Sequence, residues 1–286
     1  MWLVLAFMSA LFAGVTSVLA KLGVKDMDSN LATALRTIVV FAFAWAMVFI
    51  TGAYTPVWEI EARNLLFLAL SGLATGASWL CYFKALQMGG INKVVPVDKS
   101  SVVLTVLLAS ALLGEGLGPY KLLCVALIGA GTYMMIEKKD VTDMAGGKGW
   151  FIYAALSAVF ASLTAILGKT GVTGMDANLG TAVRTGVVLV MAWIVVFVQK
   201  GPRSVKHIGG KNWLFLAMSG CATGASWICF YHALQSGPAG VVVPVDKLSI
   251  LVTVFCGVVI FKEKVKLKSL SGLALIVAGT VWMIFI

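Results

Sequence analysis

The chain has 286 residues, of which 60% are hydrophobic and 12% are charged, and its mean hydropathy is +0.98. This composition excludes a soluble globular domain and predicts an all-α, polytopic membrane protein, because the apolar runs are continuous and about 20 residues long rather than alternating as in a barrel. The net charge of +10 lies mainly in short loops, so it predicts orientation in a bilayer and not a nucleic-acid partner.

Ten apolar runs follow one another along the chain, and we expect each to form a transmembrane helix. The first run resembles a signal peptide in its hydrophobicity, but it lacks a basic leading segment and its counterpart recurs inside the chain, so we expect a retained helix. The ten runs cover residues 2–20, 31–50, 64–86, 94–113, 117–136, 150–168, 179–198, 212–234, 241–260 and 267–286.

The two halves of the chain are copies with a constant offset of 148 residues, which takes Trp79 to Trp227. We assign a first repeat to residues 1–138, a polar linker to 139–148 and a second repeat to 149–286. Because five is odd, consecutive five-helix units must enter the membrane from opposite sides. We therefore expect two inverted five-helix repeats, a design in which transporters place the substrate site near the membrane midplane.

The most similar stretches of the two halves are residues 64–87 and 212–235, which are identical at 17 of 24 positions. Their Thr, Ser and aromatic residues recur at i, i+3, i+4 and i+7, so they share one helix face. Each stretch also contains a GxxxG, at Gly72 and at Gly220, which favours close helix packing. Packing and the lining of a substrate cavity both stay open. The candidate substrate-binding residues are Thr75, Ser78, Trp79, Tyr82, Thr223, Ser226, Trp227 and Phe230.

Arg36 and Arg184 lie about a turn and a half inside their predicted helices, after Met-Asp-x-Asn motifs that begin at Met27 and Met175. Both arginines are candidates for binding an anionic substrate group, because charge inside a membrane is costly and usually functional. The alternative is that the side chains snorkel to the interface.

A second motif, Pro-Val-Asp-Lys, begins at Pro96 and recurs at Pro244. Proline suits the first turn of a helix, so we expect a helix to begin there and its positive end to stabilise the aspartate that follows. Capping alone explains such an aspartate, but a helix start beside a break is also how transporters build ion sites. The candidate coupling and gating residues are Asp98, Lys99, Asp246, Lys247, Lys21 and Lys169, with Asp98 and Asp246 as proton carriers.

Charged residues also end particular helices of each half. Lys21 and Lys169 end the first helix, where an interfacial anchor is the alternative to a gating role. Glu115 and Glu263 end the fourth helix, where a carboxylate opposes the helix dipole, so we expect a hydrogen bond to a neighbouring helix or loop.

The Lys and Arg residues that do not recur in both halves are distributed unevenly between the two sets of loops. Most lie on the side away from the N-terminus, whereas the N-terminal side carries only Arg63 and Lys121. Because cytoplasmic loops concentrate positive charge, we expect both termini to face away from the cytoplasm.

No GxSxG, Walker A, HExxH or CxxC motif occurs in the sequence, so we expect neither an enzyme nor a bound cofactor or metal. The five cysteines lie inside apolar runs without paired spacing, which argues against a disulfide framework.

The chain resembles the EamA branch of the drug/metabolite transporter superfamily. The resemblance covers nearly the whole chain and rests on the two five-helix units, a Lys-x-Gly near the end of the first helix and a Glu that closes the fourth. The Arg-Thr, Thr-Gly-Ala-Ser-Trp and Pro-Val-Asp-Lys signatures resemble half-length EamA-like proteins, here fused in tandem. The resemblance implies a secondary transporter in which the first four helices of each half line a central cavity.

Two features depart from this family pattern. The related small multidrug resistance proteins carry an acidic residue in the first helix, whereas residues 2–20 and 150–168 contain none, so that exchange mechanism is not carried over. Family members are also usually drawn with cytoplasmic termini, and the loop charges here predict the reverse.

We therefore expect a secondary active transporter of the cytoplasmic membrane that moves a small polar or amphipathic metabolite, amino-acid or drug-like, by alternating access. Proton-coupled export is one form of this hypothesis. A flippase for lipid-linked sugars or lipids and a non-transporting membrane assembly or receptor subunit remain alternatives. The expected partners are the metabolite, the lipid bilayer and protons, without nucleic acid, and both a monomer and a homodimer stay open.

Overall fold

The computed structural model describes residues 1–23, 29–88, 94, 97–98, 100–135, 149–198, 210–260, 262 and 266–286. All regular structure within these residues is helical. Eight helical segments are long and apolar enough to cross a membrane, and two shorter apolar helices accompany them. The prediction of an all-α, multi-pass membrane protein is therefore confirmed, and the linker 139–148 falls outside the described residues.

The helices coincide with the apolar runs, because a helix satisfies its own backbone N–H and C=O groups where no water can. The first half contains α1 (Trp2–Gly23), α2 (Ser29–Thr51), the 3-10 turn η1 (Val57–Glu59), α3 (Ala62–Met88), α5 (Ser101–Leu113) and α6 (Pro119–Met135). The second half contains α7 (Gly149–Val172), α8 (Ala177–Val198), α9 (Gly210–Ser236), α10 (Ala239–Lys247), α11 (Ser249–Val259) and α12 (Leu267–Ile284).

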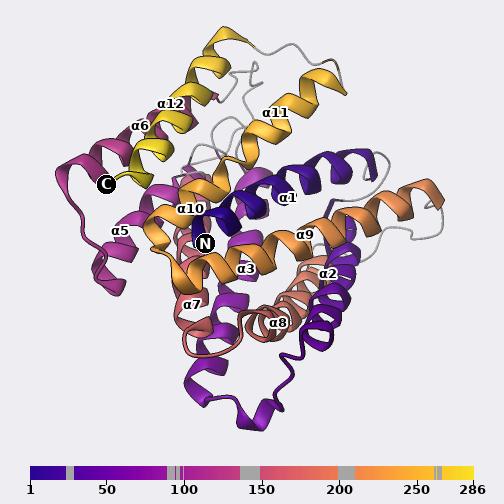
Figure 1. The fold of residues 1–286 in the computed structure, drawn as a ribbon. Helices are drawn as coiled ribbons and strands as arrows, with labels where there is room; N and C mark the ends of the chain where they lie inside the picture. Colours follow the sequence, from indigo (N-terminus) through magenta and orange to yellow (C-terminus); the bar gives the residue numbers. More distant parts are fainter. Residues whose placement is uncertain are drawn as a thin grey trace.

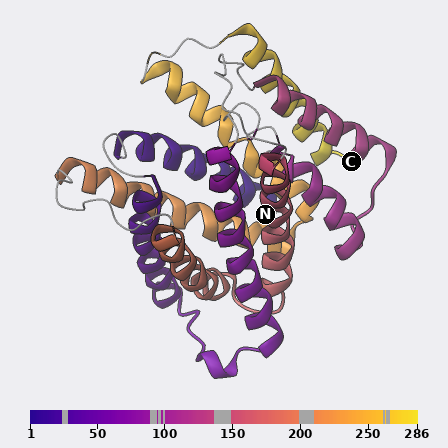
Figure 2. The same ribbon diagram turned by 180° about the vertical axis from the view of Figure 1, so that it is seen from behind.

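The helices of one half pack mainly against helices of the other half (Figures 1 and 2). α1 lies along α9, and α3 lies along α7, which are equivalent pairs under the 148-residue offset. α2 packs on α8, and each of these two also crosses the third helix of the opposite half. Neither half therefore forms a separate bundle, and residues of both halves meet throughout the centre of the protein.

α6 and α12 form a pair of their own at one edge of the molecule (Figure 1). A Cβ added to Gly131 would lie 2.5 Å from the carbonyl oxygen of Gly272, so the two backbones approach as closely as glycine allows. These small residues therefore mediate a contact between two helices of the same chain.

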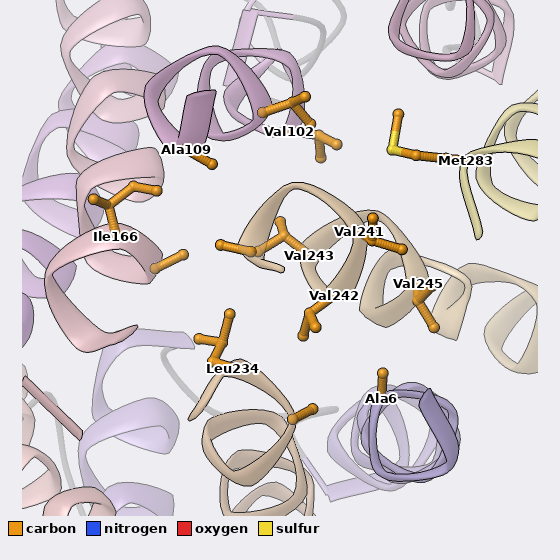
Figure 3. Packing of buried hydrophobic residues seen from close by; sticks show 14 of the residues in the cluster. Ala6, Val102, Ala109, Ile166, Leu234, Val241, Val242, Val243, Val245 and Met283 are labelled. Atoms are coloured by element: carbon orange, nitrogen blue, oxygen red, sulfur yellow. The ribbon is translucent and has the colours of Figure 1, made fainter. Parts of the chain in front are cut away.

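The short helix α10 lies at the centre of the largest apolar cluster (Figure 3). Its valines, Val241 to Val245, pack against Ala6 of α1, Leu234 of α9 and Met283 of α12. The helical path is interrupted at Leu248 and continues as α11 from Ser249. In the first half α5 begins at Ser101, the equivalent of Ser249, so the fourth helix of each half restarts at the same place.

The prediction that Pro244 begins a helix is wrong. α10 begins at Ala239, so Pro244 lies inside the helix and Asp246 lies in its last turn. The physical reason is a carboxylate from the other half, since Glu115 accepts hydrogen bonds from the backbone N–H groups of Ala239 and Gly240 and so starts the helix earlier. The positive end of α10 therefore does not explain Asp246.

Candidate functional site

Asp246 takes part in a hydrogen-bonded cluster that joins the two halves. The hydroxyl of Ser9 in α1 donates to Oδ1 of Asp246 at 2.6 Å. The hydroxyls of Ser9 and Ser226 lie 3.2 Å apart, and Ser226 in α9 donates to the backbone oxygen of Ser9. Both serines are buried. The first helix of one half thus holds the aspartate of the other half in place.

The same arrangement recurs at Asp98, 148 residues earlier in the sequence. Ser157 in α7 donates to Oδ1 of Asp98 at 2.7 Å, and the hydroxyls of Ser157 and Ser78 lie 3.2 Å apart. Ser78 donates in turn to the backbone oxygen of Ser157. We call these two groups, Asp98–Ser157–Ser78 and Asp246–Ser9–Ser226, the aspartate–serine clusters.

Sequence reasoning named the aspartates and Ser78 and Ser226, but it missed Ser9 and Ser157. These two serines share their apolar runs with other Ser and Thr residues, so no local motif distinguished them. The signal that would have found them is their recurrence at the 148-residue offset.

Arg184 is 2% exposed and lies between helices of both halves. Its Nε donates to the hydroxyl of Ser71 at 2.9 Å, and its Nη2 donates to the hydroxyl of Thr75 at 2.7 Å, both in α3. Its guanidinium also lies 5.0 Å from the ring centroids of Trp227 and of Tyr231 in α9. Arg184 therefore faces the protein interior and does not snorkel to the interface, and its role in binding an anionic group stays a prediction.

Arg36, the equivalent of Arg184, is only partly buried, and its side chain makes no hydrogen bond or ion pair within the described part of the chain. Its potential partners have the same arrangement as in the other half. Ser219 donates to the backbone oxygen of Thr16, and the hydroxyls of Thr223 and Thr16 lie 3.3 Å apart. The two arginines therefore differ in their contacts although their surroundings repeat.

The glycines of the repeated stretch serve helix packing. A Cβ on Gly72 would lie 2.7 Å from Cβ of Val187 in α8, and a Cβ on Gly220 would lie 2.6 Å from Cβ of Val39 in α2. The packing interpretation of the GxxxG is thus confirmed. Thr75 and Thr223 are buried on a different face, where they contact α7 and α1.

The predicted aromatic residues are half-buried and lie in three different places. Trp79 packs beside Ala34 of α2 and Ala192 of α8. Tyr82 packs against the small cluster around Ala85 and Ala154. Trp227 and Phe230 lie against the central apolar cluster, and the structure does not bring them together with Trp79.

Lys169 and Glu115 form an ion pair at the end of the molecule that carries the termini. Nζ of Lys169 lies 3.1 Å from Oε1 of Glu115 and donates to the backbone oxygen of Gly237 at 2.8 Å. Gly114 adopts a left-handed conformation (φ 69°) that turns the chain at the end of α5 and delivers Glu115 to the start of α10. The expected hydrogen bond of Glu115 to a neighbouring helix is confirmed.

Of the remaining charged candidates, only Lys247 has a side chain within the described residues. Lys247 has a side chain that is 46% exposed and lies 3.9 Å from Asp246, so it is a weak surface partner. Lys99, Glu263 and the side chain of Lys21 fall outside the described residues. Asp176 caps α8, because its carboxylate accepts the backbone N–H groups of Asn178 and Leu179.

A pocket of about 200 Å³ lies beside the Lys169–Glu115 pair, and Lys169 is the one candidate site residue that lines it. Its other lining residues are Glu61, Arg63, Asn64, Leu113, Thr170 and Thr173. Among the described residues, no group of three or more His, Cys, Asp and Glu side chains could hold a metal ion.

Comparison with known proteins adds three findings. The model of the EamA-like transporter family matches residues 1–137 and again residues 148–285. An uncharacterised transporter encoded in the cobO 3′ region of Sinorhizobium sp. is 46% identical over 134 residues, which cover 47% of this chain and 95% of that relative. A protein of known crystal structure superposes with a TM-score of 0.80 at 20% identity, covering 99% of this chain and 98% of that one, which shows a shared fold.

Proposed function

Because this chain belongs to the EamA-like transporter family, we propose that it is a secondary active transporter of a small polar or amphipathic metabolite in the cytoplasmic membrane. The observation that carries the proposal is the pair of aspartate–serine clusters. In each cluster, a carboxylate from the fourth helix of one half is hydrogen-bonded to the first helix of the other half. Intramembrane carboxylates are costly and typically serve proton or substrate transfer.

The architecture that we propose is ten transmembrane helices in two inverted repeats, residues 1–138 and 149–286. The equivalent packing of α1 on α9 and of α3 on α7 supports it, because a pseudo-twofold axis exchanges these pairs. The double match of the family model and the half-length relative also support it. Each aspartate–serine cluster contains residues from both repeats, so a single repeat alone would leave its aspartate without the serine of the opposite first helix.

In this proposal Asp98 and Asp246 are the coupling residues. A hydroxyl that donates to an ionised carboxylate can accept a hydrogen bond when the carboxyl group is protonated, so the serines can satisfy both states. Protonation of an aspartate then changes the bonds that hold the first helix of one half to the fourth helix of the other half. That contact is a suitable place for a proton to shift the balance between two conformations.

The end of the molecule that carries the termini is closed by Lys169, Glu115 and the start of α10. Glu115 accepts three hydrogen bonds there, from Lys169, Ala239 and Gly240, and these tie the two halves together. Alternating access requires that this end open, so we assign Lys169 and Glu115 to the gate on that side.

The test is transport by the purified protein in proteoliposomes, recorded as uptake of labelled compounds. The panel holds amino acids, organic acids and cationic drugs, with and without a pH gradient. We expect saturable transport of at least one class, lost in an Asp98→Asn/Asp246→Asn double variant and kept in the exposed-site control Glu59→Gln.

Failure of every compound in both gradients would contradict the proposal. A flippase is distinguished in the same vesicles by the accessibility of fluorescent lipids to a membrane-impermeant quencher. Lipid movement without metabolite movement would favour the flippase, and neither activity would favour a non-transporting membrane subunit.

A further inference from the structure

The hydrogen bonding of Arg184 is incomplete. Nε and Nη2 donate to Ser71 and Thr75, but Nη1 is buried and has no hydrogen-bond partner among the described residues. A buried donor without a partner is costly, and a charged one more so. The guanidinium is rigid and planar, so it cannot turn Nη1 toward a partner without losing the two bonds that it makes.

The charge of Arg184 also lacks a counter-ion in the described part of the chain. The ion pairs there involve Lys121, Lys169 and Lys247, and none reaches Arg184. Its two hydroxyl partners are neutral, and the rings of Trp227 and Tyr231 attract a cation only weakly compared with a carboxylate. Inside a membrane protein such a cation calls for an anionic partner.

The aromatic side chains around Arg184 suit a flat ligand. The ring centroids of Trp227 and Tyr231 both lie 5.0 Å from the guanidinium carbon, and the ring of Phe230 meets that of Tyr231 edge-on at 5.4 Å. A planar carboxylate is the group that a guanidinium recognises most specifically, and an aromatic wall beside it accepts an apolar substituent.

We propose that Arg184 binds the anionic oxygen group of the transported molecule, so that the substrates are small carboxylates and not cations or neutral compounds. The inference that the bound anion is transported rests on the proposed function. The inference that Arg184 binds an anion does not depend on it. It assigns distinct roles to the two arginines, because Arg36 lacks the hydroxyl and ring contacts that hold Arg184 in place.

The experiment measures equilibrium binding to purified protein in nanodiscs, without transport, by isothermal titration. The probes are benzoate, its neutral analogue benzamide and the cation benzylammonium. We expect benzoate to bind and the other two not to bind. Arg184→Gln should weaken benzoate binding by about tenfold or more, the scale of one lost charged hydrogen bond. Arg184→Lys keeps the positive charge, so it should reduce benzoate affinity less than Arg184→Gln does.

Arg63→Gln is the matched control, because Arg63 is exposed and lines the pocket beside Lys169. Loss of binding in Arg63→Gln with retention in Arg184→Gln would place the anion in that pocket and overturn the inference. Equal binding of benzoate and benzamide would overturn it as well. If Arg184→Gln fails to fold, Thr75→Val serves instead, because it removes the hydroxyl that accepts from Nη2 of Arg184. Thr75→Val should weaken benzoate binding while the melting temperature of the protein changes little.

The two proposals fail separately. Benzoate binding at Arg184 without transport of any compound would refute the transporter and leave the anion site. Transport of cations or neutral metabolites, with no benzoate binding, would leave the transporter and refute the anion site.

Discussion

Nζ of Lys169 lies 3.1 Å from Oε1 of Glu115, so an ion pair joins the end of α7 in the second half to the turn after α5 in the first half. Both side chains are mostly buried, at 19% and 10% exposure. Glu115 also accepts the first two backbone N–H groups of α10, so one carboxylate fixes a lysine and a helix start together.

Replacement of Glu115 should therefore destabilise the protein. We expect Glu115→Ala to lower the free energy of unfolding by about 3 kcal/mol, because it leaves Lys169 and two backbone donors unpaired in a buried site. Glu61→Ala, at an exposed position, should change it by about 0.5 kcal/mol or less. Denaturant unfolding in bicelles measures both, and equal effects would show that Glu115 does not hold the two halves together.

The aspartate–serine clusters predict how transport responds to a proton gradient. Asp98→Asn and Asp246→Asn should each reduce gradient-driven uptake to the level seen without a gradient, because an amide cannot change its charge. Asp176→Asn is the control, since Asp176 caps α8 and lies outside the aspartate–serine clusters. Uptake in proteoliposomes with and without a gradient is the measurement. An unchanged gradient response in both cluster variants would remove the aspartates from coupling.

The close crossings of α3 with α8 and of α9 with α2 predict which glycines tolerate a methyl group. Gly72→Ala and Gly220→Ala should each cost about 1–3 kcal/mol, the usual penalty for overpacking, because the new Cβ would overlap Val187 or Val39. Gly118→Ala should be close to neutral, because nothing lies within 4 Å of its Cβ position. Thermal unfolding ranks the three variants, and a neutral Gly72→Ala would show that the α3–α8 crossing is looser than described.

The uneven loop charge predicts orientation. An alkaline phosphatase fused to the C-terminus should be active and a fluorescent protein at the same place should be dark, because both termini are expected outside the cytoplasm. Reversing the charge balance, by adding Lys residues near Arg63 and Lys121, should weaken this bias. The opposite reporter pattern in the unaltered chain would show that the family orientation outweighs the loop charges.

Much of the fold could be predicted because the relevant signal is local. Each helix reflects a continuous apolar run, and the recurrence of Trp79 as Trp227 exposes the repeat without any structure. Side-chain partners could not be predicted in this way. Ser157 binds Asp98 across 59 residues of sequence, and Ser9 binds Asp246 across 237, distances over which no motif spacing applies.

The start of α10 shows why local rules failed at the fourth helix. Pro244 is compatible with a first-turn position, but a carboxylate 124 residues away supplies the cap for Ala239 and moves the start upstream. A helix end is satisfied by whatever acceptor lies nearby in space, and the sequence does not state which one that is.

By itself, the sequence determined that this is a helical membrane protein with duplicated halves, because hydrophobic length and repetition are properties of the chain alone. Only the tertiary structure decided which hydrogen-bond partners each of the two arginines has. Arg36 and Arg184 lie in near-identical motifs, yet Arg184 is bound by Ser71 and Thr75 and Arg36 by neither of its equivalent partners. The physical reason is that a guanidinium gains its partners from neighbouring helices, and two copies of one motif can pack differently.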